Sequence, residues 1–215
     1  MNIKEIVNTS EGDLWIMSDL HYNHQNVLKF DKRPFSNVQD MNEYIKKTLV
    51  EKIKPCDTVI DLGDMFWKCD LSVIKSVLES INPKRFYKII GNHDKESVYL
   101  RDPVVSRFFD FVGDLLDIGV KHKGKDYRLV CAHYPIISWE AKPRGAFMLH
   151  GHTHGNVDKF NDNSPDLRVD VGFYAQLARE VGSFIINFTD ILNFMTKKAG
   201  TTDFRKYVLS KCPEL

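Results

Sequence analysis

The segment LHGHTHGN, residues 149–156, places histidine at every second position, as His150, His152 and His154. Apolar side chains fill a protein core better than imidazole does, so core packing gives no reason for this spacing. Imidazole is a good ligand for transition-metal ions. Gly151 permits a turn between the first two histidines. The spacing therefore indicates metal binding, which needs further ligands from elsewhere in the chain.

Polar clusters follow five short apolar segments that have the composition of β-strands. Each cluster stands directly after its segment: Asp19 and His21; Asp64; Asn92, His93 and Asp94; His133; and His152 with His154. Ligands of α/β proteins gather just beyond the carboxyl ends of strands. These clusters therefore predict one composite site.

The number and type of these side chains predict the kind of metal centre. Seven of them are candidate ligands: Asp19, His21, Asp64, Asn92, His133, His152 and His154. In an extended segment, side chains two positions apart project to the same side, so Asp19 with His21, and His152 with His154, should each face one small region. One tetrahedral ion needs about four ligands, so this set fits two ions that share a bridging carboxylate. So much imidazole favours Zn, Fe, Mn or Ni over Ca or Mg.

Taken in order, the motifs D-x-H, G-D, G-N-H-D, a lone H and G-H-x-H resemble those of the calcineurin-like metallophosphoesterase superfamily. The segments SDLHYNHQNVLKF, RPF, DLGD, GNHD, AHYPI and HGHTHG are most similar to its small bacterial and phage-encoded members. The resemblance runs from about residue 14 to residue 172. It implies an α/β fold in which two packed β-sheets form a sandwich flanked by helices.

The resemblance also implies a role for each motif residue. The ligands of the first metal ion would be Asp19, His21 and His154. The ligands of the second would be Asn92, His133 and His152. Asp64 would bridge the two ions, with Asp61 of VIDLGD as the alternative carboxylate. His93 would be the catalytic histidine that contacts the substrate, and Asp94 would orient it.

Two divalent ions in such a site lower the pKa of a bridging water, so that hydroxide is available near neutral pH to attack phosphorus. His93 would offset charge on the phosphoryl oxygens and protonate the leaving oxygen. Mn is the first expectation for the cofactor, with Ni, Fe or Zn as alternatives. We therefore expect a dinuclear, metal-dependent phosphoesterase.

The segment GDMFWKC bears on the substrate, because related phosphoprotein phosphatases have a phosphate-binding arginine shortly after G-D, and this chain has none there. Phe66 and Trp67 offer aromatic faces instead, which suit stacking on a nucleobase. A phosphodiester or nucleotide is therefore expected. One alternative is a phosphomonoesterase whose cation comes from Arg33, Lys68, Lys142 or Arg144. Another is a non-catalytic regulatory module. Further aromatic residues near the motifs are Tyr22, Phe35, Tyr134 and Trp139; Phe35 and Tyr134 fit a core position equally well.

Several other polar residues near the motifs fit either of two roles. His150 either supports a ligand or packs within its strand, and His24 either lines the pocket or lies on the surface. His122, between two lysines, is expected in solvent. Asp170 either accepts a hydrogen bond from a ligating histidine or only ends a strand.

Short apolar segments that alternate with longer mixed ones predict the elements that position the site. The strands are expected at 14–18, 57–62, 85–90, 127–133, 146–151, 167–172 and 183–188. The helices are expected at about 38–53, 70–80 and 190–199, the last capped by Thr189 and ended by Gly200, with a possible short helix from Thr202. Residues 155–166 are expected to form an exposed loop.

The composition limits the protein class. The chain has 215 residues, 43% of them hydrophobic, and a net charge of +1. This predicts one domain over 1–215, with a segment free of motifs from about 173. A small phosphate-ester or nucleotide substrate is expected; the charge balance does not indicate nucleic acid, and the oligomeric state stays open. Without a signal-like or membrane-spanning apolar segment, and with four cysteines that lack zinc-ribbon spacing, we expect a soluble, cytoplasmic protein with reduced thiols.

Overall fold

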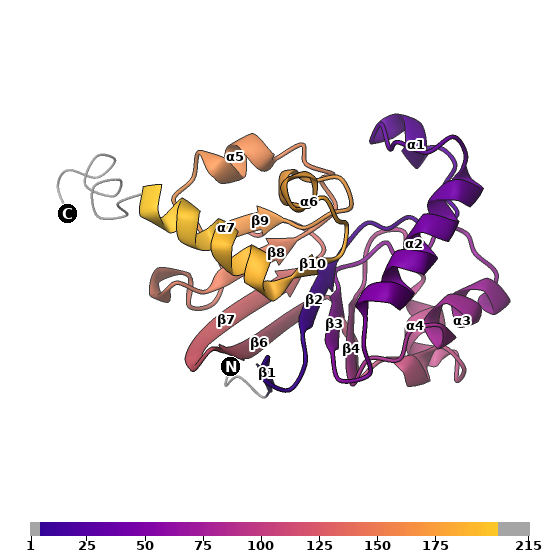
Figure 1. The fold of residues 1–215 in the computed structure, drawn as a ribbon, viewed down its shortest axis with the longest axis horizontal. Helices are drawn as coiled ribbons and strands as arrows, with labels where there is room; N and C mark the ends of the chain where they lie inside the picture. Colours follow the sequence, from indigo (N-terminus) through magenta and orange to yellow (C-terminus); the bar gives the residue numbers. More distant parts are fainter. Residues whose placement is uncertain (1–4, 202–215) are drawn as a thin grey trace.

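Two five-stranded sheets pack together and are flanked by helices, as Figure 1 shows for this computed structural model. The structure describes residues 5–201, except for the side chains of residues 96, 97, 100, 200 and 201. One sheet has the strand order β1 (Ile6–Asn8), β6 (Leu115–His122), β7 (Lys125–Ala132), β8 (Phe147–His150) and β9 (Arg168–Asp170). The other has the order β10 (Ile186–Asn187), β2 (Leu14–Met17), β3 (Thr58–Asp61), β4 (Arg85–Ile89) and β5 (Phe111–Gly113). The expected sandwich of two sheets is confirmed.

Helices account for most of the remaining regular structure. The α-helices are α1 (Val27–Phe30), α2 (Val38–Lys52), α3 (Leu71–Glu79), α4 (Glu96–Arg101), α5 (Asp158–Asp162), α6 (Gln176–Val181) and α7 (Phe188–Thr201). The 3₁₀-helices are η1 (Ser106–Phe108) and η2 (Lys142–Arg144). Within the described part of the chain, no helix is long and apolar enough to cross a membrane.

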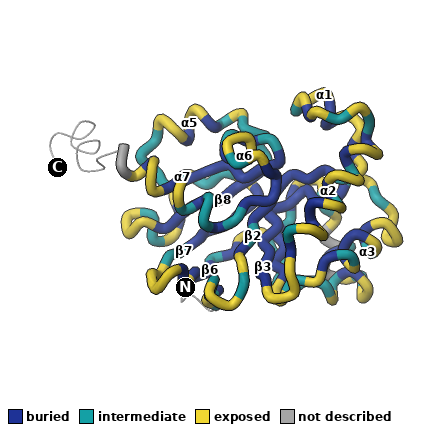
Figure 2. Tube along the Cα trace, viewed as in Figure 1, coloured by how far each residue is buried: buried dark blue, intermediate teal, exposed yellow. Residues whose placement is uncertain are grey.

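The alternation of side chains along the strands divides the core into layers. Ile60 of β3 belongs to the cluster between the two sheets, whereas its neighbour Val59 packs with Ile45 of α2 and Ile74 of α3. Successive strand residues point to opposite faces, so a strand covered on both faces is apolar throughout. Figure 2 accordingly shows the central strands as buried and the outer helix surfaces as exposed.

Strand direction places the polar clusters at one edge. Strands β2, β3 and β4 are parallel to one another, and β8 is parallel to β7 and β9. A parallel bridge between Ser18 and Gly172 joins the two sheets just past the ends of β2 and β9. The carboxyl ends of strands from both sheets therefore meet in one place.

The long elements agree with the sequence predictions, and the short ones do not. Helices α2, α3 and α7 and strands β2, β3, β4, β7, β8 and β9 lie where they were expected. The predicted strand 183–188 was too long, since only Ile186–Asn187 pairs, and the predicted loop 155–166 contains α5. The elements that were not predicted are α1, α4, α6, β1, β5 and β6. Most of these are too short to display a hydrophobic period, and β6 contains Asp117 and Gly119 within its length.

The ends of α7 also differ from the prediction. The helix begins at Phe188, and the side chain of Asn187 accepts a hydrogen bond from the Thr189 N–H (2.9 Å), so Thr189 is not the N-cap. Gly200 lies within the helix. The possible helix from Thr202 lies outside the described residues, and the single domain over 1–215 stays a prediction.

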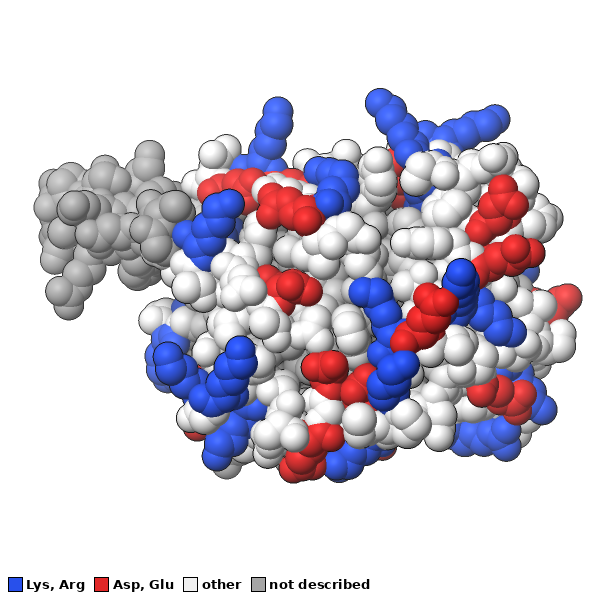
Figure 3. Space-filling view, in the orientation of Figure 1, with Lys and Arg blue, Asp and Glu red and all other residues white. Residues whose placement is uncertain are grey.

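The surface charges are mixed in sign, and the cysteines that the structure describes are free thiols. Basic and acidic side chains are interspersed over the face drawn in Figure 3. Cys56, Cys69 and Cys131 are free thiols, and Cys212 lies outside the described residues.

Candidate metal centre

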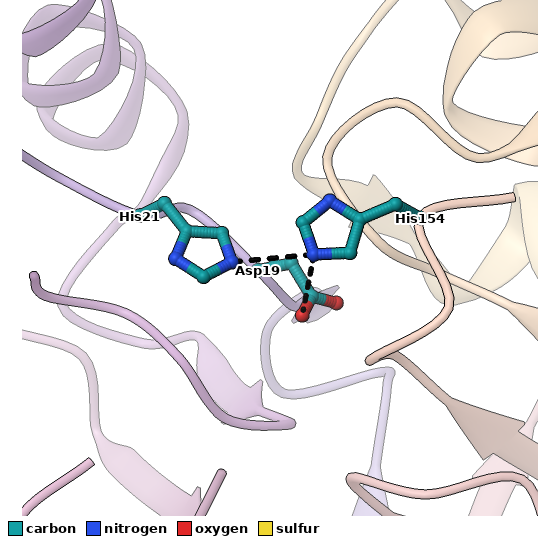
Figure 4. Close-up of side chains that lie close together, drawn as sticks. All are labelled: Asp19, His21 and His154. Atoms are coloured by element: carbon teal, nitrogen blue, oxygen red, sulfur yellow. Dashed lines mark hydrogen bonds and ion pairs between the residues drawn. The ribbon is translucent and has the colours of Figure 1, made fainter. Parts of the chain in front are cut away.

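The first group of candidate ligands consists of Asp19, His21 and His154 (Figure 4). The first two follow β2, and His154 follows β8. His21 Nε2 lies 3.2 Å from His154 Nε2, which lies 3.6 Å from Asp19 Oδ1. Two nitrogens bound to one tetrahedral ion at about 2.1 Å would be about 3.4 Å apart. The spacing of the two imidazoles fits a shared transition-metal ion.

Asp64, just after β3, places its carboxylate between two histidines. Its Oδ2 lies 3.9 Å from His21 Nε2 and 3.5 Å from His133 Nε2. Asp64 belongs with Asp19 and His133 to a second group of side chains that could hold an ion. The alternative carboxylate, Asp61, instead pairs with Lys88 at 2.5 Å. Of the two carboxylates that the sequence offered, Asp64 is therefore the one that lies between the two histidines.

Asn92, His133 and His152 form the third part of the site. Asn92 Oδ1 lies 3.0 Å from His133 Nε2 and 2.8 Å from His152 Nδ1. One amide oxygen and two imidazole nitrogens thus converge, although they come from the ends of β4, β7 and β8. The structure brings together all seven residues that the sequence suggested as ligands.

Burial keeps the central imidazoles neutral, which is the form that binds metal ions. Burial lowers the pKa of His21 to about 2 and that of His133 to about 4. His133 Nδ1 donates to the carbonyl of Leu62 (2.8 Å), which leaves the lone pair on Nε2. Burial also raises the pKa of Asp19 to about 7, and the nearby carboxylates of Asp170 and Asp64 add to this effect. Both effects favour a bound cation.

Five of the candidate ligands have backbone conformations that are unusual outside glycine. Positive φ angles occur at Asp19 (54°), His21 (50°), Asp64 (56°), His152 (67°) and His154 (49°). Such conformations cost free energy and concentrate at functional sites. The expectation that these segments are extended was wrong. As a result, His152 and His154 belong to different groups, with His152 beside Asn92 and His154 beside Asp19.

Glycines allow the segments to approach one another closely. A Cβ at Gly151 would lie 1.9 Å from Ser18 Oγ and 2.3 Å from Asp19 Oδ2, and one at Gly91 would lie 2.2 Å from Asp64 Oδ1. Gly151 does not have a positive φ. It is needed for close packing, and not for the turn that the sequence suggested.

Asp31 and Arg33 support the first group, and sequence reasoning missed this role. The Asp31 carboxylate lies 2.8 Å from His154 Nδ1, so it orients that ring. Burial lowers the pKa of His154, but the hydrogen bond to Asp31 and the nearby carboxylates raise it overall. Arg33 pairs with Asp31 (2.8 Å) and donates to the carbonyls of Asp19 (2.8 Å) and Leu20 (2.7 Å).

Asp94 has a different neighbourhood from the one expected. Its Oδ2 accepts hydrogen bonds from the N–H groups of Asp64 and Gly91, both at 2.9 Å, and pairs with Lys88 at 2.7 Å. Within the described residues, no hydrogen bond joins it to the His93 ring. Asp94 therefore positions the backbone of Asp64, whereas His93 is attached through its own N–H to Asp64 Oδ1 (2.8 Å).

The His93 ring lies exposed at the edge of the site, beside Trp67. The two ring centroids are 4.6 Å apart in an edge-on arrangement. His24 stacks on Trp67 with centroids 3.8 Å apart and planes at 8°, so it lines the site. His24 therefore covers one face of the indole, and stacking on a nucleobase would have to use the other face.

Tyr134 is an exposed aromatic residue next to His152. Its side chain is 51% exposed, and its ring centroid lies 4.5 Å from that of His152. Trp139 is a core residue that donates to the Ala146 carbonyl (3.0 Å). Phe35 is partly buried against the core.

The other residues whose role was uncertain from the sequence have structural contacts. His150 is buried and contacts the Gly151 carbonyl (2.9 Å) and the Asn161 side chain (3.1 Å). His122 is also buried, 2.8 Å from Thr9 Oγ1, so the expectation of a solvated ring was wrong. Asp170 accepts from the Thr153 hydroxyl (2.5 Å) and holds the loop rather than a ligating histidine.

Three of the four cations considered for phosphate binding are engaged elsewhere. Arg33 is committed to Asp31 and backbone carbonyls, as above. Lys142 pairs with Asp166 (2.8 Å), and Arg144 pairs with Glu140 (3.2 Å). Lys68 is the one whose ammonium has only the Trp67 ring, at 5.3 Å, as a described partner.

Comparison with known proteins gives consistent results. A family model described as calcineurin-like phosphoesterase matches residues 13–183. An uncharacterized protein of Methanocaldococcus jannaschii is 30% identical over 144 residues, 66% of this chain and 70% of the relative. The gene 66 protein of Mycobacterium phage D29 is 25% identical over 173 residues, 72% of this chain and 84% of the relative. The crystal structure of an Aquifex aeolicus protein of unknown function has the same fold, with a TM-score of 0.60, 22% identity, and coverage of 85% of this chain and 98% of the other. The chain belongs to the calcineurin-like phosphoesterase family.

Proposed function

We infer that this protein is a dinuclear metal-dependent phosphoesterase. The observation that carries the proposal is the position of Asp64, whose Oδ2 lies within 4 Å of both His21 Nε2 (3.9 Å) and His133 Nε2 (3.5 Å). A carboxylate shared by two buried, neutral imidazoles has little structural purpose without cations. It suits a ligand that serves two ions at once.

The residues divide into two ligand sets around Asp64. Asp19, His21 and His154 hold one ion, and Asn92, His133 and His152 hold the other. Two divalent ions supply an activated water and positive charge for the phosphoryl oxygens. Mn is the expected metal, with Ni, Fe or Zn as alternatives, because the donor set combines imidazole nitrogens with carboxylate and amide oxygens.

His93 is the proposed catalytic residue of the chain itself. Its exposed ring stands at the edge of the site, fixed by its N–H on Asp64 and by the edge of Trp67. From there an imidazole can donate a hydrogen bond to a phosphoryl oxygen and a proton to the leaving oxygen. Asp94 acts through Asp64, as a positioning residue.

A phosphodiester is the proposed substrate class. A phosphomonoester dianion favours a fixed cation such as a bidentate arginine. Arg33, the arginine nearest the site, is buried and directs its guanidinium to Asp31 and to backbone carbonyls. A diester, with one negative charge, needs no such partner.

Metal content and hydrolysis, measured on the same samples, test the proposal. The wild-type protein should bind two Mn ions and hydrolyse bis-p-nitrophenyl phosphate with a higher kcat/KM than p-nitrophenyl phosphate. Asp64→Ala should lose metal and activity together. His122→Asn is the matched control, because it changes a buried polar residue that contacts Thr9, away from the site.

Three results would count against the proposal. One ion per chain in a fully active sample would exclude the bridged centre. A preference for the monoester would exclude the diester reading. Two ions without hydrolysis of either ester would favour a regulatory module.

A further inference from the structure

A cavity of about 700 Å³ opens beside the metal centre. Its walls are the connections that follow β3 and β4, from Phe66 to Ile74 on one side and from Asn92 to Tyr99 on the other. Asn92, a candidate ligand, and His93, the proposed catalytic residue, both line this cavity. A substrate whose phosphorus lies at the centre therefore has one ester arm directed into this space, which has the volume of ordinary small-molecule sites.

The lining is apolar on one part and basic on another. Phe66, Ile74 and Tyr99 are buried and form an apolar surface. Lys68 and Lys95 also line the cavity, and neither belongs to an ion pair within the described part of the chain. An apolar surface with two unpaired ammonium groups suits an arm that has both a ring system and an anionic group.

The acidic residues of the lining do not cancel this charge. Asp94 pairs with the buried Lys88 (2.7 Å), which it shares with Asp61 (2.5 Å), so its charge is offset in part. Asp70 is the other described carboxylate of the lining, so the two lysines face one aspartate and a second whose charge is partly offset. Lys68 also has a positive φ of 47°, a conformation that costs free energy and that concentrates at ligand sites.

We propose that this cavity binds one arm of the phosphodiester, and that the arm is nucleotide-like, with a terminal phosphate of its own that Lys68 and Lys95 contact. The proposal rests on the proposed function and narrows its substrate class. Because His24 covers one face of Trp67, the ring of the arm is bound through apolar contact with the cavity wall rather than between stacked rings.

Kinetics with matched dinucleotides test the proposal. The substrates are thymidine dinucleotides with a terminal phosphate at the 5′ or the 3′ end, compared with the same dinucleotide without it. The wild-type protein should prefer at least one phosphorylated form, mainly through a lower KM. In the Lys68→Gln/Lys95→Gln variant, the ratio of kcat/KM between the phosphorylated and the unphosphorylated dinucleotide should fall about tenfold, since a hydrogen bond to a charged group is removed. Added salt should also weaken it.

Lys46→Gln/Lys75→Gln is the control, because it removes the same charge from residues outside the cavity. Lys46 contacts Ser76, and Lys75 pairs with Glu79. This control should keep the full preference. An equal preference in both double variants, or no preference in the wild type, would overturn the proposal.

A binding measurement separates this proposal from the proposed function. Calorimetric titration of the metal-loaded protein with thymidine 3′,5′-bisphosphate measures binding without hydrolysis of a diester. Affinity should fall about tenfold in the Lys68→Gln/Lys95→Gln variant and not in the control. If bis-p-nitrophenyl phosphate is hydrolysed but neither assay distinguishes the two double variants, the subsite fails and the phosphodiesterase stands. If no ester is hydrolysed but binding depends on the two lysines, the catalytic proposal fails alone.

Discussion

Lys88 and Asp94 form a fully buried ion pair, with Nζ 2.7 Å from Oδ2, and the same oxygen accepts the N–H of Asp64. Lys88 also pairs with Asp61 at 2.5 Å. One ammonium thus contacts two carboxylates, those of Asp61 and Asp94, next to the backbone of Asp64. Because Lys88 belongs to β4 and Asp94 holds the backbone of Asp64, the same ion pair supports both the sheet and the conformation of Asp64.

Replacing Lys88 with Met should therefore destabilise the protein. The change keeps much of the side-chain volume but leaves two buried carboxylates without a cation, and breaking a buried pair costs about 3–5 kcal/mol. Urea unfolding should show this loss, whereas Lys75→Met, at an exposed pair, should change stability by less than about 1 kcal/mol. Equal stability of the two variants would show that the buried carboxylates are already neutral.

His93→Ala should separate catalysis from metal binding. The ring is exposed and belongs to neither group of metal-binding side chains, so the metal content should stay near that of the wild type. The kcat should fall by about 10²–10⁴, the range for losing one general acid or one oxyanion-type donor. Metal analysis and steady-state kinetics check both parts. Loss of both ions would mean that His93 is a ligand.

Asp31→Asn should weaken metal binding without removing a ligand. The Asp31 carboxylate holds His154 Nδ1 at 2.8 Å and pairs with Arg33. Losing such a support typically costs 10- to 100-fold in metal affinity. Titration with Mn²⁺ measures it. Asp166→Asn, which breaks the pair with Lys142, should leave the affinity unchanged, and an equal loss in both variants would contradict the assignment.

Gly151→Ala should disturb the site through packing alone. The added Cβ would lie 1.9 Å from Ser18 Oγ and 2.3 Å from Asp19 Oδ2. The loop must shift away, at a cost of about 1–3 kcal/mol, and His152 shifts with it. Gly124→Ala is the control, because its Cβ would meet no atom within 4 Å and its φ of +76° adds only backbone strain. Thermal unfolding and metal titration should show a loss of metal affinity for Gly151→Ala alone.

The sequence predicts the composition of this site better than its shape. Strand ends followed by Asp, Asn or His identify the residues, because parallel strands bring their carboxyl ends together. The positive φ angles of Asp19 and His154 have no local signal, since tertiary contacts impose them. Arg33 looks like a surface cation until its hydrogen bonds to Asp19 and Leu20 are seen. Lys88 did carry a signal, because a lysine within the apolar strand 85–90 calls for a buried partner.

Removing the metal should abolish activity and lower stability together. The site gathers Asp19 and Asp64 with four imidazoles, and burial raises the pKa of both carboxyl groups. A chelator should therefore abolish hydrolysis and lower the Tm, since an ion that binds only the folded chain stabilises it by mass action. Added Mn²⁺ or Ni²⁺ should restore both, whereas Mg²⁺ should restore neither fully, because it prefers oxygen ligands. Activity assays and thermal scans on stripped protein, repeated with Asp64→Ala, check this. Full activity with Mg²⁺ alone would contradict the imidazole-rich ligand set, and an unchanged Tm on adding Mn²⁺ would mean that these side chains hold no ion.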